Sequence, residues 1–434
     1  ALDVGAAVGA SDLLEVDMGG TSFDICVIRN RRIPTTKDAW VGDERVATKM
    51  VDISAIGAGG GSIAWIDSLG LLRVGPQSAG ADPGPAAYGR SELPTVTDAD
   101  VVLGYVPADY FLGGELRLDR ERALAAVRTV AEPLGLDPDA GAEAIFETVN
   151  GTMADAVTEA CTRKGLDVRG FAMVAGGGAG GVHGAEIARR LGIPRIVCPA
   201  TGPALSAMGM LTMEVGRELT RAGVWDRAAA AAAEINATFA ELIAEQAEAF
   251  ARSGIDPGTV RYRRALAMRY EGQFHEIDVE LPEGELDDAG RATIDTRFHR
   301  RYEELYGYSL PWRTVEVLEC HLRGSVPQGG PRTVEARHGE PPPLAVARAG
   351  GRRCRIAGTH RDVPVYHRER LASGHAFAGP ALVDSATSTV LVPDGFEASV
   401  DGAGNLLLTQ GDAARPAAAI AAAEPAAGAR KGGA

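Results

Sequence analysis

The chain has 434 residues, of which 45% are hydrophobic and 24% charged, so it can bury a sizeable core in two or three domains. Its formal net charge of −14 would repel a phosphate backbone, and no Lys/Arg stripe with interleaved aromatic residues offsets it. No apolar run approaches the ~20 residues that a membrane-spanning helix needs. We therefore expect neither nucleic acid nor a membrane as a partner.

The cysteines and the N-terminus indicate the compartment. The five cysteines are scattered and show no Cys-x-x-Cys spacing, which is typical of a reducing environment. The first residues lack the charged and apolar regions of a signal peptide, so a cytoplasmic location is expected. The chain opens with Ala1 instead of Met, which suggests a fragment of a longer protein.

The first half alternates short apolar runs with glycine turns and amphipathic helices, a pattern that predicts an α/β fold. Residues 13–17 and 23–29 read as a β-hairpin that turns at Gly19 and Gly20. Further on, the pattern predicts a helix over 142–164 ending at Gly165, a buried strand over 171–175, a turn over 176–181, a helix over 185–191 and a strand over 195–198.

The character of the sequence changes near Gly223, where we place a domain boundary. An alanine-rich amphipathic helix is followed by an alternating segment, 270–281, and by several short strands. Residues 324–351 are rich in Pro, Gly and Arg and predict a loop or linker. The predicted domains are therefore 1–222, an α/β lobe, and 223–411, an α+β domain rich in strands. Residues 412–434, mostly Ala, Pro and Gly, predict a disordered tail.

The hairpin turn is the first candidate site. Asp17 ends a strand, Gly19 and Gly20 form the turn, and Thr21, Ser22 and Asp24 follow. Glycines let backbone N–H groups point into one concavity, hydroxyls add donors, and a carboxylate can hold a divalent ion. This combination suits the phosphate tail of a nucleotide. An ordinary hairpin with capping side chains is the competing interpretation.

The second candidate is the glycine turn between a buried strand and a helix. Its glycines are Gly176, Gly177, Gly178, Gly180 and Gly181. Free N–H groups at a helix N-terminus and bare backbone suit a base or ribose, although tight packing alone also explains such a turn. His183 follows directly, and a catalytic or ligand role competes with that of a packed or capping histidine.

Three further segments have constrained sequences. Residues 56–63 predict a glycine turn into a helix, and 74–85 predict a rigid irregular loop, so both are candidates to line a pocket. Thr97, Asp98 and Asp100 fall at a predicted strand-to-helix junction. Capping explains these carboxylates as well as metal binding does.

Taken together, these segments resemble the hydantoinase A/oxoprolinase family from about Val8 to Leu408. The resemblance rests on VDMGGTSFDICVI, DISAIGAGGGSIAWID, VGPQSAGADPGPAAYGR, PTVTDADVVLGY, AGGGAGGVHGAEIARRLGIPRIVCPATGPALSAMGML, RYEGQFHEIDVELP, YEELYGY and GHAFAGPALVDSATSTVLVPDGF. Two departures stand out. Val182-His183-Gly184 replaces the family's usual Pro-Leu-His-Ala, and the family's N-terminal lobe, which carries a first Asp-x-Gly-Gly-Thr hairpin, is missing from this chain.

The resemblance implies an actin-like (ribonuclease H-like) ATPase lobe followed by a β-rich domain. It implies that Gly19, Gly20, Thr21 and Ser22 belong to the second phosphate motif and residues 176–181 to the adenosine motif. ATP with Mg²⁺ or another divalent metal is the implied cofactor. We expect Asp17 to hold the metal, bound through water. Asp24 and His183 are the expected catalytic residues, with Asp24 orienting the hairpin or the metal shell.

The resemblance also implies the activity, which is hydrolysis of a cyclic amide such as a hydantoin or 5-oxoproline after its phosphorylation by ATP. Relatives that carboxylate acetone or acetophenone make a ketone carboxylase subunit the main alternative, and a non-catalytic nucleotide-binding subunit is the other. The expected polypeptide partners are the missing N-terminal lobe and a hydantoinase B-type subunit. Alone, the fragment is expected to be inactive.

Overall fold

The computed structural model describes residues 1–36, 39–41, 44–46, 50–225, 230–327 and 340–411. By compactness the chain forms two units, one of Ala1–Gly209 with Arg332–Ala434 and the other of Met210–Pro331. The predicted tail, 412–434, lies outside the described residues. Within the described part, no helix combines the length and the hydropathy that crossing a membrane requires.

The first unit is built on an eight-stranded mixed sheet in the order β18-β21-β22-β11-β10-β1-β2-β7. The predicted hairpin is confirmed, since β1 and β2 pair antiparallel, and β1, β10 and β11 are parallel neighbours. The strands are β1 (Leu13–Met18), β2 (Phe23–Ile28), β7 (Ser54–Ile56), β10 (Ala172–Gly176), β11 (Arg195–Cys198), β18 (Ala376–Ala378), β21 (Phe396–Val400) and β22 (Leu406–Gln410).

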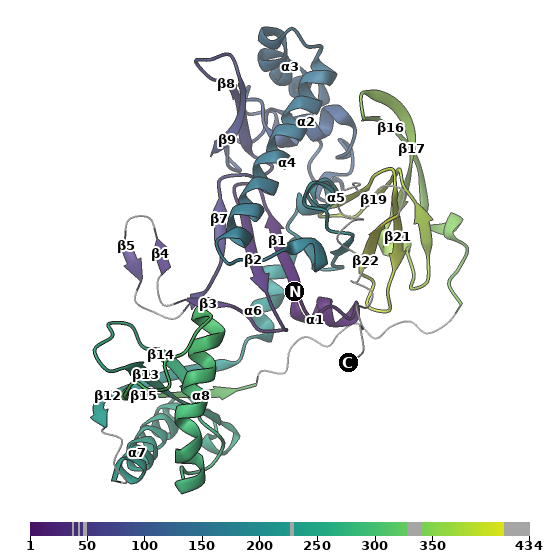
Figure 1. The fold of residues 1–434 in the computed structure, drawn as a ribbon. Coiled ribbons are helices and arrows are strands. Elements are labelled where there is room, and N and C mark those ends of the chain that lie inside the picture. The colour runs from purple at the N-terminus through teal and green to yellow at the C-terminus, as the bar shows by residue number, and fades with distance from the viewer. Residues whose placement is uncertain (37–38, 42–43, 47–49, 226–229, 328–339, 412–434) are drawn as a thin grey trace, which may run out of the picture. The chain divides into compact units, whose positions relative to one another are not determined.

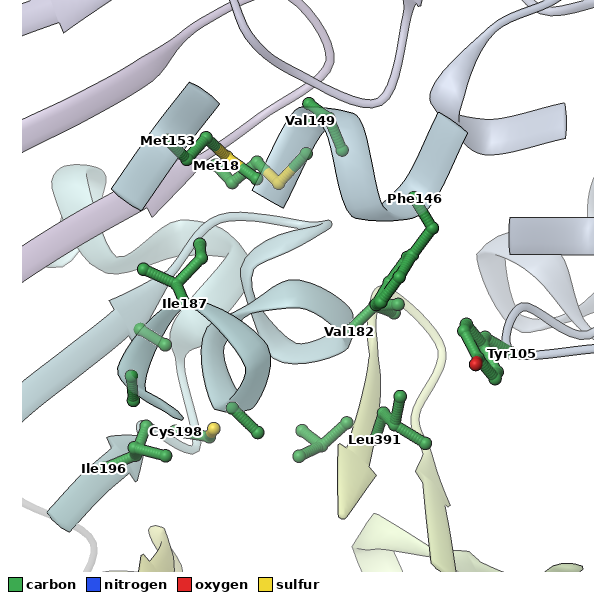
Figure 2. Packing of buried hydrophobic residues seen from close by; sticks show 14 of the residues in the cluster. Met18, Tyr105, Phe146, Val149, Met153, Val182, Ile187, Ile196, Cys198 and Leu391 are labelled. Atoms are coloured by element: carbon green, nitrogen blue, oxygen red, sulfur yellow. The ribbon is translucent and has the colours of Figure 1, made fainter. Parts of the chain in front are cut away.

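Helices enclose the main core on one face of this sheet (Figure 1). α4 (Pro138–Thr162) and α5 (Gly180–Leu191) lie against the strands, and α2 (Val96–Leu103) and α3 (Arg120–Ala131) pack on α4. The predicted apolar stripe of α4 is confirmed, because Ile145, Val149, Met153, Val157 and Cys161 are all buried. Figure 2 shows Phe146, Val149 and Met153 projecting from α4 into this core beside Val182 and Met18.

The opposite face of the same strands carries different chemistry. Leu14, Val16 and Met18 of β1 point into the main core, whereas Leu13 lies in a small cluster with residues of α1 (Leu2–Ala7). Because strand side chains alternate, Glu15 and Asp17 share that second face with Leu13. Strand β1 therefore has one face in the main core and an opposite face that carries the carboxylates of Glu15 and Asp17.

The C-terminal strands return to the first unit. Three join the large sheet, and four form a second sheet in the order β16-β17-β19-β20. Its strands are β16 (Arg348–Ile356), β17 (Thr359–His367), β19 (Ala381–Asp384) and β20 (Thr389–Val392). The compact units thus divide the chain at places different from the predicted boundary at 223, because strand pairing joins segments far apart in sequence. The predicted α/β class with a β-rich C-terminal region is confirmed.

The second unit is a four-stranded antiparallel sheet, β12-β15-β13-β14, with its own apolar cluster. The elements are β12 (Val215–Trp225), α7 (Ala230–Arg252), β13 (Arg261–Tyr270), β14 (Ile277–Glu280), α8 (Asp288–Tyr306) and β15 (Val315–Val326). α7 is the predicted alanine-rich helix. A short helix, α6 (Leu205–Thr212), contains the point at which the two units divide.

Several local predictions differ from the structure. The glycine turn at 56–63 leads into a strand, β8 (Ser62–Ile66), and not into a helix, since the bulky side chains of Ile63, Trp65 and Ile66 favour a strand. β8 pairs with β9 (Leu72–Ser78), which takes up the first half of the predicted irregular loop. Residues 270–281 are not continuous, since a turn separates β13 from β14, and β15 and β16 extend into both ends of the predicted linker.

Four further short strands complete the first unit. They form two separate two-stranded ribbons after β2. The strands are β3 (Thr35–Thr36), β4 (Ala39–Val41), β5 (Glu44–Val46) and β6 (Met50–Val51).

Candidate nucleotide site

Two predicted glycine-rich turns meet at one edge of the large sheet. β1 and β10 are parallel and in register, with Asp17 opposite Gly176, so the turns that follow them emerge side by side. The backbone N–H of Ala179 donates to the carbonyl of Met18 over 3.0 Å and joins the two turns directly. The carboxyl ends of adjacent parallel strands are where open α/β sheets bind ligands.

The hairpin turn is open. The N–H of Gly19 donates to the carbonyl of Ser22 at 3.2 Å, and Gly20 and Thr21 are exposed. A Cβ added at Gly19 or Gly20 would meet no atom within 4 Å. No described residue accepts a hydrogen bond from the backbone N–H of Gly20, Thr21 or Ser22. The turn therefore offers free backbone donors and empty space, which is what an anion requires.

A second glycine loop supports the hairpin from behind. The N–H groups of Gly60 and Gly61 donate to the carbonyls of Gly19 and Gly20 at 3.0 and 2.6 Å. A Cβ on Gly59 would lie 2.7 Å from the Gly20 carbonyl carbon, so the backbones touch. This loop therefore engages two carbonyls of the turn and leaves the N–H groups of residues 20–22 without an acceptor among the described residues. The sequence predicts that residues 56–63 could line a pocket, but it does not predict their hydrogen bonds to the hairpin.

Carboxylates lie beside the hairpin turn. Asp24 lies opposite Asp17 in the ladder, and burial, reinforced by the Asp17 charge, raises the pKa of Asp24. The Ser22 hydroxyl donates to Asp24 Oδ2 over 3.5 Å. Burial, again reinforced by Asp17, raises the pKa of Glu15 to about 7. Carboxylates thus gather on this face, where the charge of Asp17 raises the pKa of both Glu15 and Asp24.

Ser206 is a polar partner of Asp17 that was not predicted from the sequence. Its hydroxyl donates to Asp17 Oδ2 over 2.8 Å, across 189 positions of sequence. The residue lies within the ALSAMGML stretch of the family resemblance, but an exposed serine in an apolar segment carries no signal for this contact. Ser206 fixes one oxygen of the predicted metal ligand.

The glycine turn at 176–181 is mostly closed. A Cβ on Gly177 would lie 2.2 Å from the Met18 carbonyl oxygen, one on Gly181 2.5 Å from the Thr389 oxygen, and one on Gly176 2.9 Å from Leu205 Cδ2. Gly178 is the exposed member, and its nearest neighbour, the Thr387 carbonyl oxygen, lies at 3.8 Å. Gly180 has ordinary contacts from 3.7 Å outwards. Close packing thus accounts for three of these glycines, and Gly178 is left facing open space.

His183 lies behind this turn and not in it. The ring is fully buried, with Nδ1 3.1 Å from Asn150 Oδ1 and Nε2 3.3 Å from Asp100 Oδ2, and it stacks on Phe146 with centroids 4.9 Å apart. A buried ring with both nitrogens engaged has no free atom to offer a substrate. The geometry favours the packed-histidine interpretation.

The carboxylate of Asp98 caps a helix. It accepts hydrogen bonds from the N–H groups of Thr95, Ala86 and Ala87 at 2.9, 3.1 and 2.7 Å, and Thr95 and Asp98 form a capping box at α2. Thr97 lies beside the supporting loop, and its N–H donates to the Gly60 carbonyl at 2.7 Å. Capping therefore explains Asp98. It is one of the two interpretations, capping and metal binding, that the sequence left open.

The side chains beside the hairpin turn determine what kind of metal ion can bind there. Across the described ranges, no group of three or more His, Cys, Asp or Glu side chains lies close enough to hold a metal ion. Asp17 and Asp24 nevertheless lie opposite each other beside the open turn, and their repulsion contributes to the raised pKa of Asp24. This arrangement fits a cation that keeps most of its water, as Mg²⁺ usually does, and does not fit an ion held by protein ligands alone.

An α/β lobe with two glycine-rich turns at the carboxyl edge of parallel strands defines a candidate nucleotide-binding protein. Sequence models match the chain over nearly its full length, "Hydantoinase/oxoprolinase" over residues 1–218 and "Hydantoinase/oxoprolinase C-terminal domain" over 223–409. The chain belongs to the hydantoinase/oxoprolinase family.

Individual relatives sharpen this assignment. The chain is 33% identical to the caprolactamase subunit alpha of Pseudomonas jessenii, over 94% of this chain and 60% of that protein. It is 30% identical to the acetone carboxylase beta subunit of Xanthobacter autotrophicus, over 92% and 59%. A nucleotide-free structure of acetone carboxylase matches with a TM-score of 0.84 at 27% identity, over 94% and 60%. The chain thus spans about three-fifths of the length of these relatives.

Proposed function

We propose that this chain carries part of the ATP site of an enzyme that opens a cyclic amide after phosphorylating it. The observation that carries the proposal is the meeting of the open hairpin turn, 19–22, with the glycine turn, 176–181, at one sheet edge. The relatives include caprolactamase and 5-oxoprolinases, and the matched acetone carboxylase is described as ATP-dependent. The substrate class is a lactam, a hydantoin or 5-oxoproline.

The reaction balances as a phosphoryl transfer followed by hydrolysis. The amide oxygen forms a bond to the γ-phosphorus while the bond to the β–γ bridging oxygen breaks, so ADP leaves. Water then adds to the activated carbon, the C–N bond breaks and the nitrogen takes up a proton, which leaves an acyl phosphate. A second water attacks the acyl carbon, the C–O bond to phosphorus-bound oxygen breaks, and phosphate leaves with the former amide oxygen while the carboxylate forms. Catalysis of such a transfer depends on positioning and on stabilising charge more than on covalent chemistry.

Different residues bind the phosphates, the divalent ion and the nucleoside. The N–H groups of Gly20, Thr21 and Ser22 bind phosphate oxygens, and the loop at 57–61 holds them in place. Asp17, fixed by Ser206, holds the divalent ion through water, and Asp24 orients the hairpin through Ser22. When bound, the ion neutralises charge on the phosphates. Gly178 lies where a base or ribose can approach the backbone.

The whole enzyme needs more polypeptide than this chain. Its relatives are longer, and three are described as an alpha, a beta and a gamma subunit. We propose that an N-terminal lobe with the opposing hairpin and a hydantoinase B-type subunit complete the site, and that the assembly works in the cytoplasm. Without them, this chain would bind ATP weakly and turn over no substrate.

A ketone carboxylase is the second candidate. The match to acetone carboxylase, with a TM-score of 0.84, favours it specifically. The same phosphate-binding groups serve both reactions, because ketone carboxylation also draws on ATP. Pocket walls that the shared motifs do not encode decide between an amide and a ketone.

Isotope transfer tests the proposal. The chain is assembled with its upstream lobe and neighbouring subunit, and ADP release is measured with a panel of cyclic amides whose carbonyl oxygen is ¹⁸O. Phosphorylation of the amide predicts amide-dependent ADP release and ¹⁸O in the phosphate. ADP release that requires both a ketone and bicarbonate would instead establish the carboxylase. If neither substrate class stimulates ATP hydrolysis, the enzyme proposal fails.

A further inference from the structure

The buried His183 ring joins three helices just behind the glycine turn. Asp100 belongs to α2, Asn150 and Phe146 to α4, and His183 itself to the first turn of α5. Both ring nitrogens lie within hydrogen-bonding distance of an oxygen, at 3.1 and 3.3 Å. Figure 2 shows Phe146 reaching from α4 to the start of α5 beside Val182.

The hydrogen bonds fix the proton on Nδ1. The Asn150 amide nitrogen donates to the Phe146 carbonyl over 2.9 Å, so the amide oxygen must face the ring. Reversing the amide would set two acceptor oxygens against each other. An amide oxygen only accepts, and Nδ1 therefore carries a hydrogen.

The contact between Nε2 and Asp100 leaves two places for the proton between them. Nε2 faces Asp100 Oδ2, and the hydrogen lies either on Nε2, beside a carboxylate that accepts it, or on the Asp100 carboxyl, beside a neutral ring. The second oxygen, Asp100 Oδ1, is buried and finds no partner in the described part of the chain. A carboxylate held this way is stabilised by a neighbouring positive charge, and a buried charge left without one is costly. A ring that carries protons on both nitrogens supplies that charge.

The bridge acts on the glycine turn through the backbone. Gly176 to Gly181 lead directly into α5, whose first N–H groups belong to the proposed nucleotide site. The His183 N–H donates to the Ala179 carbonyl at 3.4 Å, and Ala179 in turn is bonded to Met18 at the end of β1. The side chain that holds the first turn of α5 thereby sets the direction of these N–H groups.

We propose that His183 is an imidazolium bridging Asp100 and Asn150, and that this bridge positions the first turn of α5 and residues 176–181 for the nucleotide. His183 is thus a positioning residue and touches neither ATP nor substrate. The positioning half rests on the proposed function. The protonation of both ring nitrogens does not depend on the proposed function.

Ring ¹⁵N spectra of the intact chain test the first half. With ¹⁵N-labelled histidine at neutral pH, the His183 signals, identified by their loss in His183→Gln, are expected to show a proton on each ring nitrogen. A deprotonated signal on either nitrogen would overturn the imidazolium. This measurement needs no nucleotide, so its result stands whether or not the chain binds ATP.

ATP titration tests the second half. Asp100→Asn keeps the side-chain shape but removes the charge, and we expect ATP to bind roughly tenfold more weakly, a size typical of coupling between sites. The double variant with His183→Gln is expected to lose no more than the more affected single variant, because both changes break one bridge. The matched control is His360→Gln, which removes a partly exposed pair with Asp139, 3.4 Å long and also anchored on α4.

The outcomes separate the two proposals. If the wild-type chain binds no ATP, alone or in its assembly, the nucleotide site itself is refuted. If the wild type binds ATP and Asp100→Asn binds it equally well, only the positioning role is refuted. If the variants do not fold, titrating ATP into the ¹⁵N-labelled wild type still tests the positioning role of His183. The His183 ring signals are expected to shift more than those of His360, and unmoved His183 signals would exclude positioning.

Discussion

The two glycine-rich turns of the candidate site look alike in sequence and differ in space. At the hairpin, glycines 19 and 20 face empty volume, and the strands that flank the turn carry the opposed carboxylates of Asp17 and Asp24. At the second turn, the space that a Cβ would need at Gly177 and Gly181 is occupied, chiefly by backbone atoms of Met18 and Thr389. The first turn is therefore open and charged, and the second is closed apart from Gly178.

This difference shows that glycine serves two purposes at one sheet edge. At 19 and 20, the missing Cβ leaves room for a ligand to approach the backbone. At 177 and 181, the missing Cβ lets two chain segments pack in contact. This comparison can be tested with substitutions that add a side chain at one turn or the other. Their effects on ligand binding and on the free energy of unfolding are then measured separately.

Gly177→Ala should have the largest effect on stability. The residue has φ of +84°, and its Cβ would lie 2.2 Å from the Met18 oxygen, so strain and a backbone clash add up. We expect a loss of more than ~3 kcal/mol in the free energy of unfolding, measured by chemical denaturation. Gly165→Ala is the control, since it has φ of +65° and nothing within 4 Å. Equal losses would mean that φ alone matters and that the turn is not closed.

Glu15→Gln tests the charge on the hairpin side. Burial and Asp17 raise the pKa of Glu15 from 4.5 to about 7, so the folded chain holds this proton more tightly than the unfolded chain. Native stability therefore falls as pH rises through that window and stays low above it.

The glutamine variant should escape that loss. At about pH 8 it should be more stable than wild type by up to ~3 kcal/mol, and the advantage should vanish below the unfolded pKa. Denaturation at both pH values measures this, with Glu397→Gln, an exposed strand carboxylate, as the control. An advantage that does not change with pH would show that shape and not charge is responsible.

Gly181→Ala should cost less than Gly177→Ala. Its Cβ would lie 2.5 Å from the Thr389 oxygen, but the helix gains propensity from alanine, and the net loss should be ~1–2 kcal/mol. The neighbouring Gly180→Ala, with contacts from 3.7 Å, should be neutral or stabilising when both variants are unfolded by chemical denaturation. If Gly181→Ala were as stable as Gly180→Ala, the close contact between α5 at Gly181 and β20 at Thr389 would not limit the side chain at this position.

Local signals explain what the sequence predicted. The hairpin follows from two apolar runs around a glycine turn, and α4 follows from a fourfold stripe, because both patterns lie within one segment. The role of each glycine did not follow, since the atoms that touch Gly177 and Gly181 belong to β1 and β20. His183 is similar, as its partners lie 83 and 33 positions earlier in the chain. Spacing along a single sequence does not encode such contacts.

Gly20→Ala should have the smallest effect on stability and the most specific effect on binding. Its Cβ meets nothing within 4 Å, so the free energy of unfolding should change by less than ~0.5 kcal/mol. The same methyl group occupies the space beside the free N–H groups, and ATP affinity in the assembled enzyme should fall about tenfold. Gly170→Ala, also exposed and without neighbours, is the matched control and should leave both quantities unchanged. Because the fold does not need the space at Gly20, unchanged ATP affinity in Gly20→Ala would mean that no phosphate enters it, and the open turn would lose its proposed purpose.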